Sequence, residues 1–368
     1  MQTTTQLPSS ERDSFVNAGQ LLTGLAVLIA TLAFMWWGFL LLRNSAELNH
    51  FFVAAFAIVW GVAGVGLLYF SLNRMVESFG DRVRTIVQPY IFVGPAVLLL
   101  TWFLVLPTIR TAILSFMDSD STNFVGLSNY AAVFTDSQML ESFRNNVLWM
   151  VFGTFFCVSL GLLIAVFADR SKFERIAKAI IFMPMAISFV GAAVIWRFVY
   201  FYQAPGQQQI GLLNSIVTGL GGQPQTWIVN QPSNVFFLIV ILIWMQTGFA
   251  MVIFSSALKG VPDDLLEAGR IDGANERRIF FNIIIPYIQG TIITVTTTIL
   301  IFTLKIFDVV IAMTGGQYGT EVIATQFYRQ FFQNRNFGYG SAIAMVLVLA
   351  VIPVMIYNLR QSGKQEAF

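Results

Sequence analysis

Long apolar runs separated by short polar stretches make up most of this chain. A helix needs about 20 apolar residues to cross the hydrocarbon core of a membrane. Eight runs approach or exceed that length, at residues 21–42, 51–72, 91–116, 147–168, 179–201, 235–258, 287–313 and 340–357. The pattern therefore predicts an all-α polytopic membrane protein with about eight transmembrane helices.

Proline residues lie inside several of these runs, among them Pro95, Pro107, Pro184 and Pro353. Proline kinks a helix and frees carbonyl groups, which neighbouring helices must satisfy inside a membrane. A bundle supplies such partners, whereas a single anchor does not. We therefore expect these helices to pack against one another.

The composition agrees with a membrane protein. Hydrophobic residues make up 56% of the 368 residues and charged residues only 11%, whereas soluble domains carry about 25% charge. The net charge is +2 and the basic residues lie in short loops, so we expect no nucleic-acid binding. One cysteine, Cys157, and one histidine, His50, cannot build an intrachain disulfide or a structural metal site, and we interpret both as packing or interface residues.

Basic residues are distributed unevenly over the loops. Loops on the cytoplasmic side of a membrane protein carry an excess of Lys and Arg. One set of alternate loops holds fourteen of them, and the other set holds five. We therefore expect both termini to lie in the cytoplasm with the first set. The run at 21–42 is too long for a signal-peptide core, so we expect it to be retained.

Residues 261–286, VPDDLLEAGRIDGANERRIFFNIIIP, form a long polar passage between two apolar runs. Pro262 suits the first turn of a short helix, where its missing N–H costs nothing. Asp272 and Gly273 should end that helix, because Gly tolerates the positive φ of a turn and Asp readily caps the next helix. A second helix is expected from Ala274 to Ile285. Two short helices at an angle predict a rigid knob on the cytoplasmic side.

The knob resembles the EAA loop of bacterial ABC-importer permeases, whose pattern is E-A-A-x3-G-x9-I-x-L-P. Five residues match it in register, namely Glu267, Ala268, Gly273, Ile283 and Pro286. Gly269 replaces the third-position Ala, and Ile285 replaces the Leu. Three further stretches are similar to the maltose-type, carbohydrate-uptake branch: I-D-G-A at 271–274, F-V-G-L-S-N-Y at 124–130 and T-G-G at 314–316.

The resemblance implies a fold and a division of the chain. Residues 85–368 would form the six-helix core of a type I ABC-importer permease, with an EAA coupling loop at 259–286. Residues 1–84 would be an N-terminal region with two extra transmembrane helices. The chain would lie in the cytoplasmic (inner) membrane of a bacterium.

The same resemblance implies partners. The chain has no G-x4-G-K-[ST] loop to hold nucleotide phosphates, so a separate dimer of ATPase subunits would bind ATP and Mg²⁺. The chain itself would be no enzyme and would bind neither cofactor nor metal. Its other partners would be a second homologous permease, an extracytoplasmic solute-binding protein, membrane lipid and a sugar-like solute.

Residues of the knob receive roles from the resemblance. Glu267 would contact the ATPase, and Gly273 would supply the turn between the helices. A lone loop glycine would mean little, and only its place in the pattern gives Gly273 this role. The resemblance implies that three further residues provide packing of the knob, namely Leu266, Ala268 and Ile271. Gly269, at the third position of the pattern, is also counted among the coupling residues.

Lys305 and Asp308 are charged residues inside an apolar run, and such residues are costly unless they face a partner or a cavity. Their spacing of three places both on one face of a helix. They could neutralise each other as an ion pair, or they could offer hydrogen bonds to solute hydroxyls. Sugar permeases similarly place polar residues in this helix shortly before the T-G-G, which favours the second interpretation.

The preceding run offers Trp244, Gln246, Thr247 and Phe249. Aromatic faces with a nearby amide and hydroxyl suit a sugar, because the C–H face of the ring stacks while its hydroxyls find partners. A single aromatic residue more often packs against lipid or helices, so Gln246 is the better candidate. Ser188 is a weaker one, since small hydroxyls in membrane helices commonly bond their own backbone.

Two functions of different class remain. The first is a permease subunit for an α-glucoside, a disaccharide or a glycosylated polyol, among which these residues do not choose. The alternative is a self-contained secondary transporter that uses Lys305 and Asp308 as a coupling pair, which leaves the EAA pattern unexplained. An intramembrane enzyme is disfavoured because the sequence has no Ser/His or Cys/His arrangement and no cluster of metal ligands. The source of energy, ATP or an ion gradient, discriminates the first two.

Overall fold

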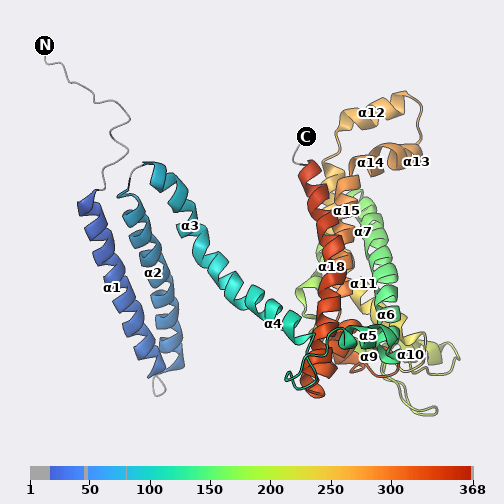
Figure 1. Ribbon diagram of the computed structural model, residues 1–368. Helices are drawn as coiled ribbons and strands as arrows, with labels where there is room; N and C mark the ends of the chain where they lie inside the picture. The colour runs from blue at the N-terminus through green and yellow to red at the C-terminus, as the bar shows by residue number, and fades with distance from the viewer. Residues whose placement is uncertain (1–16, 45–48, 80, 366–368) are drawn as a thin grey trace. The chain divides into compact units, whose positions relative to one another are not determined.

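The computed structural model describes residues 17–44, 49–79 and 81–365 of the chain, and these are mainly helical (Figure 1). Residues 1–16, which would carry the expected cytoplasmic N-terminus, lie outside the described part. Within the described ranges the only β-pairing is an isolated bridge between Met117 and Phe124. The all-α class expected from the apolar runs is therefore confirmed.

The chain forms two compact units, Met1–Ile109 and Arg110–Phe368. The first contains α1 (Ala18–Arg43), α2 (His50–Val76) and α3 (Asp81–Leu100). A π-helical turn, Thr101–Val105, carries α3 into α4 (Leu106–Leu114), and the division between the units falls within α4. The boundary expected between residues 84 and 85 is the start of the six-helix core of the family, whereas the two compact units are defined by packing. The expected boundary therefore stays a prediction.

Within the first unit, α1 and α2 lie side by side (Figure 1). The Trp60 ring of α2 lies directly on Gly38 of α1, where a Cβ would come within 2.0 Å of the indole nitrogen. That nitrogen donates a hydrogen bond to the carbonyl oxygen of Phe34 at 3.2 Å. A side chain at Gly38 would therefore break both the packing and the hydrogen bond between the two helices.

The second unit is built around long helices, with short helices at both of its ends (Figure 1). The helices of the bundle begin with α6 (Ser137–Leu148), which continues through a π-helical turn, Trp149–Gly153, into α7 (Thr154–Asp169). They continue with α8 (Glu174–Phe182), α9 (Phe189–Val199), α11 (Asn234–Lys259), α15 (Gln289–Leu304), α16 (Asp308–Met313) and α18 (Phe337–Gln365). Other short helices are α5 (Ser128–Thr135), α10 (Leu212–Gly219) and α17 (Ile323–Tyr328), the last followed by a π-helical turn, Arg329–Gln333.

Helix α11 is the centre of the second unit. Of the residues in its apolar window 56% are buried, against 28% or less in each other straight span of the described residues. Its side chains take part in two hydrophobic clusters, around Leu238 and Leu242 towards one end and around Met251 and Phe254 towards the other. The other spans leave most of their apolar surface exposed, as expected of faces that meet lipid or partner chains.

Two glycines let other backbones approach α11. A Cβ at Gly161 of α7 would lie 2.5 Å from the Ala250 Cβ of α11. A Cβ at Gly248 of α11 would lie 2.4 Å from the carbonyl oxygen of Ile181 in α8. Helices in a membrane gain no hydrophobic advantage from pairing, so small residues that permit close van der Waals contact set where they cross.

The expectation of about eight spans agrees with the structure, although two spans are bent. Among the described residues, six helices are long and apolar enough to cross a membrane, and two pairs bent by more than 40° raise the number to as many as eight. The pair Glu174–Ala186 and Phe189–Val199 turns by 104°. Pro184 lies in a 3₁₀ turn, and Ile187 is extended with φ −89° and ψ 141°, so the helix ends there and a new one begins. The pair Glu276–Tyr287 and Gln289–Leu304 turns by 68° after Pro286.

Replacing Gly161 by Leu should force α7 away from α11, because the Cβ alone would already overlap Ala250. Overpacking of this kind costs about 1–3 kcal/mol, so we expect a lower thermal unfolding midpoint for the protein in detergent. Gly66→Leu in α2 is the control, since no atom lies within 4 Å of a Cβ there. Equal midpoints for the two variants would contradict the packing role of Gly161.

Candidate functional site

Two short helices form the knob, as the sequence predicts. The first is α12 (Asp263–Ile271). The second begins as α13 (Glu276–Ile279), passes through a π-helical turn, Phe280–Ile284, and ends as α14 (Ile285–Tyr287). Figure 1 shows these helices together at one end of the second unit, opposite the end that holds α5 and α10.

The ends of α12 differ slightly from expectation. Pro262 is the residue before the helix, with φ −61° and ψ 134°, rather than part of its first turn. Gly273 ends the segment with φ +77°, the conformation for which glycine was expected. The cap of the second helix is Asn275, whose side chain accepts a hydrogen bond from Arg278 N at 2.9 Å, so the expectation that Asp272 caps it is wrong. A capping side chain reaches only the N–H groups two or three residues ahead, and the helix starts too late for Asp272.

Gly269 is the point where the two helices of the knob meet. It is buried, and a Cβ there would lie 2.7 Å from Cδ1 of Ile283. Its carbonyl oxygen also accepts a hydrogen bond from Ala274 N at 3.0 Å. Gly269 therefore holds the knob together, and Ala at this position would require Ile283 to move.

The outer face of α12 is open. Glu267 and Ala268 are exposed, Leu266 is half-buried, and Ile271 is 85% exposed at the end of the helix. Gly273 has no neighbour within 4 Å of a Cβ position. The residues assigned to coupling thus divide into Gly269, which faces inward, and a rigid outer face that a partner can contact. Their contact with an ATPase stays a prediction.

A cluster of charged residues joins three spans where the knob begins. Lys178 of α8 pairs with Asp169, the last residue of α7, and its Nζ lies 2.6 Å from Oε1 of Glu174. Lys259, the last residue of α11, pairs with the same Glu174 carboxylate. Ser255 Oγ of α11 donates to Oδ1 of Asp169 at 2.8 Å. The Lys178 and Asp169 side chains are only 17% and 16% exposed, so this ionic cluster is largely shielded from water.

Glu276 connects the knob to the end of α7. Its two carboxylate oxygens lie 3.5 Å from Nη2 of Arg170 and 3.4 Å from Nε of Arg270. All three side chains are more than half exposed, so each pair contributes at most about 1 kcal/mol. Three contacts that link different helices were not predicted from the sequence, because their partners are 85 to 106 residues apart along the chain.

The polar residues of α11 occupy different environments. The Gln246 side chain is 4% exposed, yet its amide forms no hydrogen bond with any residue that the structure describes. Thr247 Oγ1 donates to the carbonyl oxygen of Ile243 at 2.6 Å, so its proton is already used. Trp244 packs edge-on against Trp196 with ring centroids 5.9 Å apart. The amide atoms of Gln246 are not among the fully enclosed polar atoms without a partner, so the amide retains accessible surface that a ligand or partner can contact. This makes Gln246 the strongest candidate here.

Lys305 and Asp308 do not share one helix face, contrary to the expectation from their spacing. Helix α15 ends at Leu304, and α16 begins at Asp308, with Phe307 at φ −139° and ψ −57° between them. Both side chains are exposed, and among the described residues neither forms an ion pair. Lys305 Nζ instead lies 5.9 Å from the centre of the Phe302 ring. The mutual ion pair is therefore absent, and binding of solute by these residues stays a prediction.

Ser188 stabilises the start of α9. Its Oγ accepts a hydrogen bond from Gly191 N at 3.0 Å and so caps α9 directly after the 104° bend. This agrees with the expectation that a small hydroxyl bonds nearby backbone. Binding of solute by Ser188 stays a prediction.

Asn146, which was not among the residues chosen from the sequence, stabilises the break between α15 and α16 near Lys305. Its Nδ2 donates to the carbonyl oxygen of Leu304 at 3.0 Å, and its Oδ1 accepts from Ile323 N at 2.8 Å. The side chain is 2% exposed. Two adjacent amides, Asn145 and Asn146, at the start of an apolar run were the available signal, since buried amides need such partners.

Glu321 is a buried carboxylate outside the spans. It pairs with Arg329, and its second oxygen accepts a hydrogen bond from Gln326. Asn145 Nδ2 of α6 donates to the carbonyl oxygens of Gly319 and Glu321, and these two bonds hold residues 319–321 against α6. Burial raises the pKa of Glu321 to about 7, because the opposing effect of Arg329 is smaller than the loss of water.

Comparisons with known proteins agree with the resemblance of the knob. Residues 157–362 match the model of the family described as binding-protein-dependent transport system inner membrane component. The osmoprotective compounds uptake permease protein GgtC of Synechocystis sp. is 56% identical over 275 residues, 75% of this chain and 99% of the relative. The alpha-glucoside transport system permease protein AglF of Rhizobium meliloti is 50% identical over 333 residues, 87% of this chain and 99% of the relative.

A solved structure supports the fold. The crystal structure of a bacterial ABC transporter involved in the import of the acidic polysaccharide alginate matches 77% of this chain and 99% of its own chain. The TM-score is 0.67 and the sequence identity 18%. At that identity the likeness concerns the arrangement of helices alone.

Lys178→Met should destabilise the protein, because it leaves the shielded Asp169 carboxylate without its cation. Removing one partner of a largely shielded pair costs about 1–3 kcal/mol, after allowance for its partial exposure. Arg170→Met removes a pair that is 67% and 61% exposed, and it should cost at most about 1 kcal/mol. Thermal unfolding of both variants in detergent tests this, and an Arg170→Met midpoint as low as that of Lys178→Met would contradict the ranking.

The raised pKa of Glu321 predicts a pH dependence. A carboxyl group with a folded pKa of about 7 binds its proton more tightly in the folded state than in the unfolded state. Its contribution to stability is therefore present at low pH and is lost as the pH rises from about 5 towards 7. We expect the thermal unfolding midpoint to fall over this range in the wild type and to fall less in Glu321→Gln. Asp120→Asn, at an exposed position, is the control and should leave the wild-type slope unchanged.

Proposed function

The chain belongs to the family of binding-protein-dependent transport system inner membrane components, and on that premise we propose that it carries a sugar-like solute through an ATP-driven ABC importer. As a membrane-spanning component of such an importer it serves transport. Its proposed partners are a second homologous permease, a dimer of ATPase subunits and an extracytoplasmic solute-binding protein.

The rigid knob supports the proposed contact with an ATPase. Gly269 packs α12 onto the helix that continues into the 68° bend, so the two helices move as one body. The outer face with Glu267 and Ile271 is free to enter a cleft of a partner. ATP and Mg²⁺ belong to that partner in this proposal, because the sequence contains no loop for nucleotide phosphates.

The ionic cluster gives the knob a mechanical connection to the membrane helices. Asp169 and Lys259 are the last residues of α7 and α11, and Glu174 is the first residue of α8. Lys178 of α8 contacts both Asp169 and Glu174, and Lys259 contacts Glu174. Helix α12 begins shortly after Lys259, the last residue of α11, and Lys259 pairs with Glu174 of α8. A displacement of α12 therefore acts on the end of α11 and, through Glu174, on α8. This connection is how movement at the ATPase would reach the solute path.

Gln246 is the observation that carries the solute proposal. A buried amide with no partner among the described residues offers one acceptor and two donors, which match the hydroxyl groups of a sugar. Trp244, Thr247 and Phe249 on the same helix supply ring faces and a hydroxyl oxygen. The two relatives carry alpha-glucoside transport and osmoprotective compound uptake in their names, which supports an α-glucoside, a disaccharide or a glycosylated polyol as the solute.

The proposed orientation places the knob and both termini in the cytoplasm of a bacterium. The excess of basic residues in the loops on the side of the knob supports it. Lys305 and Asp308, exposed at the break between α15 and α16, then face either the second permease or the solute. A secondary transporter coupled through these two residues is less well supported, because they form no ion pair with each other.

Uptake by the complex, reconstituted in liposomes with its partner subunits, tests this function. We expect α-glucosides such as maltose or trehalose, or glucosylglycerol, to stimulate ATP hydrolysis, and we expect vanadate to block uptake. Gln246→Leu should lower uptake about tenfold, since an unmatched buried polar group costs about 1–3 kcal/mol. Glu267→Lys should instead uncouple ATP hydrolysis from uptake.

The matched control for Gln246→Leu is Gln333→Leu, which changes an exposed glutamine outside the spans and should leave uptake unchanged. Basal ATP hydrolysis should persist in Gln246→Leu, because the knob is intact. Uptake that resists vanadate but collapses with a protonophore would overturn the proposal in favour of a secondary transporter.

A further inference from the structure

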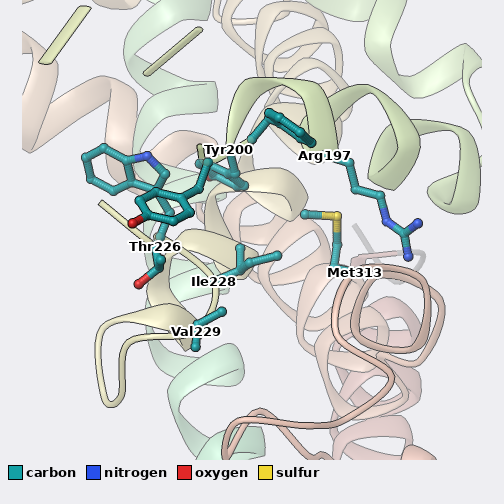
Figure 2. Close-up of a pocket in the computed structure, with 9 residues that line it drawn as sticks. Arg197, Tyr200, Thr226, Ile228, Val229 and Met313 are labelled. Carbon is teal, nitrogen blue, oxygen red and sulfur yellow. The ribbon is translucent and has the colours of Figure 1, made fainter. Parts of the chain in front are cut away.

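A small cavity lies at the end of the second unit opposite the knob. It has a volume of about 270 Å³. Its walls come from the end of α9 and the residues after it, from segment 226–229 and from the end of α16. Figure 2 shows Arg197 and Met313 on one side of this space and Thr226 and Val229 on the other. None of these residues belongs to the candidate site around Gln246.

The walls are mainly aromatic and aliphatic, and most of their polar groups are already engaged. Tyr200 donates its hydroxyl to the carbonyl oxygen of Phe237 at 2.8 Å. Trp227 donates its indole N–H to Oδ1 of Asn214 at 3.0 Å. These bonds fix the two rings and engage their polar atoms. Tyr200 is buried, so Trp227, which is half-buried, offers the larger ring surface to the cavity. Such pre-positioned ring surfaces suit the C–H face of a pyranose.

Two polar groups at the cavity remain available. The guanidinium group of Arg197 donates to the carbonyl oxygen of Ala312, and among the described residues it has no other hydrogen bond and no carboxylate partner. Because a guanidinium group carries five N–H donors, several are left. The phenol of Tyr202 forms no hydrogen bond with a described residue either. A few directed donors beside apolar rings are what a neutral polyhydroxy ligand requires.

A continuous series of ring contacts connects this cavity to α11. The centroids of neighbouring rings are 5.1 to 5.9 Å apart in the order Trp227, Phe237, Tyr200, Trp196 and Trp244. The series ends at Trp244 in the middle of α11. The cavity is thus connected by packed rings to the helix that also carries Gln246.

We propose that this cavity binds a single pyranose ring of the solute on the extracytoplasmic side, before the solute reaches Gln246. This inference rests on the proposed function, since it assigns the solute a second binding site. The volume is near the lower end of the range for small-molecule pockets, which is about 300–1,000 Å³, and therefore fits one ring better than a chain of sugars. Residues 202–233, which supply five of the nine residues lining the cavity, contain no charged residue, so Arg197 is the one charged group among its lining residues.

A phospholipid is the main competing ligand, because apolar walls with one arginine can also hold an acyl chain and a phosphate. Two features favour the sugar. The Arg197 guanidinium group is already bonded to a carbonyl oxygen, which partly balances its charge without an anion. The small volume leaves little room for an acyl chain.

Saturation-transfer NMR with methyl α-D-glucopyranoside, on the complete transporter complex in nanodiscs, tests the proposal. The measurements use the Gln246→Leu background, in which the inner candidate site is impaired. Val229→Trp should fill the cavity and reduce the signal of the sugar ring at least about fivefold. Val240→Trp is the matched control, because both valines are 39% exposed and Val240 does not line the cavity.

A second pair of variants tests the hydrogen bonds. Tyr202→Phe should weaken binding of the glucoside about two- to tenfold, as expected for one lost hydrogen bond. Tyr318→Phe is its control, since that tyrosine is 46% exposed and lies outside the cavity. A signal that is equal in Val229→Trp and Val240→Trp overturns the proposal.

Lipid analysis and uptake separate the remaining outcomes. A phospholipid that co-purifies with Val240→Trp but not with Val229→Trp, together with no sugar signal in either, overturns the sugar site in favour of a lipid. If the wild-type complex takes up α-glucosides while the cavity variants bind the probe equally well, only this inference fails. If the wild type takes up none of them, the proposed function fails, and the inference fails with it.

Discussion

Close packing around α11 is the constraint on which the rest of the second unit depends. Gly161 and Gly248 leave no room for a side chain between α11 and its neighbours, because a Cβ at either position would overlap an atom of the adjacent helix. In a membrane such contact, rather than the hydrophobic effect, holds helices together. The same helix contains Gln246 and ends at Lys259, where the knob begins. The positions of the solute candidate and of the knob are therefore set by one element.

Breaks in the helices occur where other residues stabilise them. Ser188 caps the helix after the 104° bend, and Asn146 binds the carbonyl oxygen left free at Leu304. Irregular backbone at membrane depth persists only where protein or a cavity satisfies its polar groups. Both breaks lie on helices that pack against α11, α9 after the first and α16 after the second. They make the bundle irregular on the side where the candidate solute residues lie.

Local sequence predicted the class of the protein and the knob well. The apolar runs and Gly273 with its positive φ are properties of neighbouring residues, and each appeared as expected. Where the expectation failed, a non-local contact or a shifted boundary was the cause. The spacing of Lys305 and Asp308 indicated one helix face, but Asn146, some 160 residues earlier, supports a break between them. Asp272 was expected to cap a helix that in fact begins after Asn275.

The sequence by itself determined an all-α membrane protein with about eight spans and a two-helix knob, because run length and turn chemistry depend on adjacent residues. Tertiary structure alone decided which polar groups meet one another. Lys178 of α8 meets Asp169 of α7 and Ser255 of α11, and Asn146 of α6 bonds backbone atoms of Leu304 and Ile323. Whether a side chain is engaged depends on which backbones lie near it, and that follows from the packing of helices that are distant along the chain.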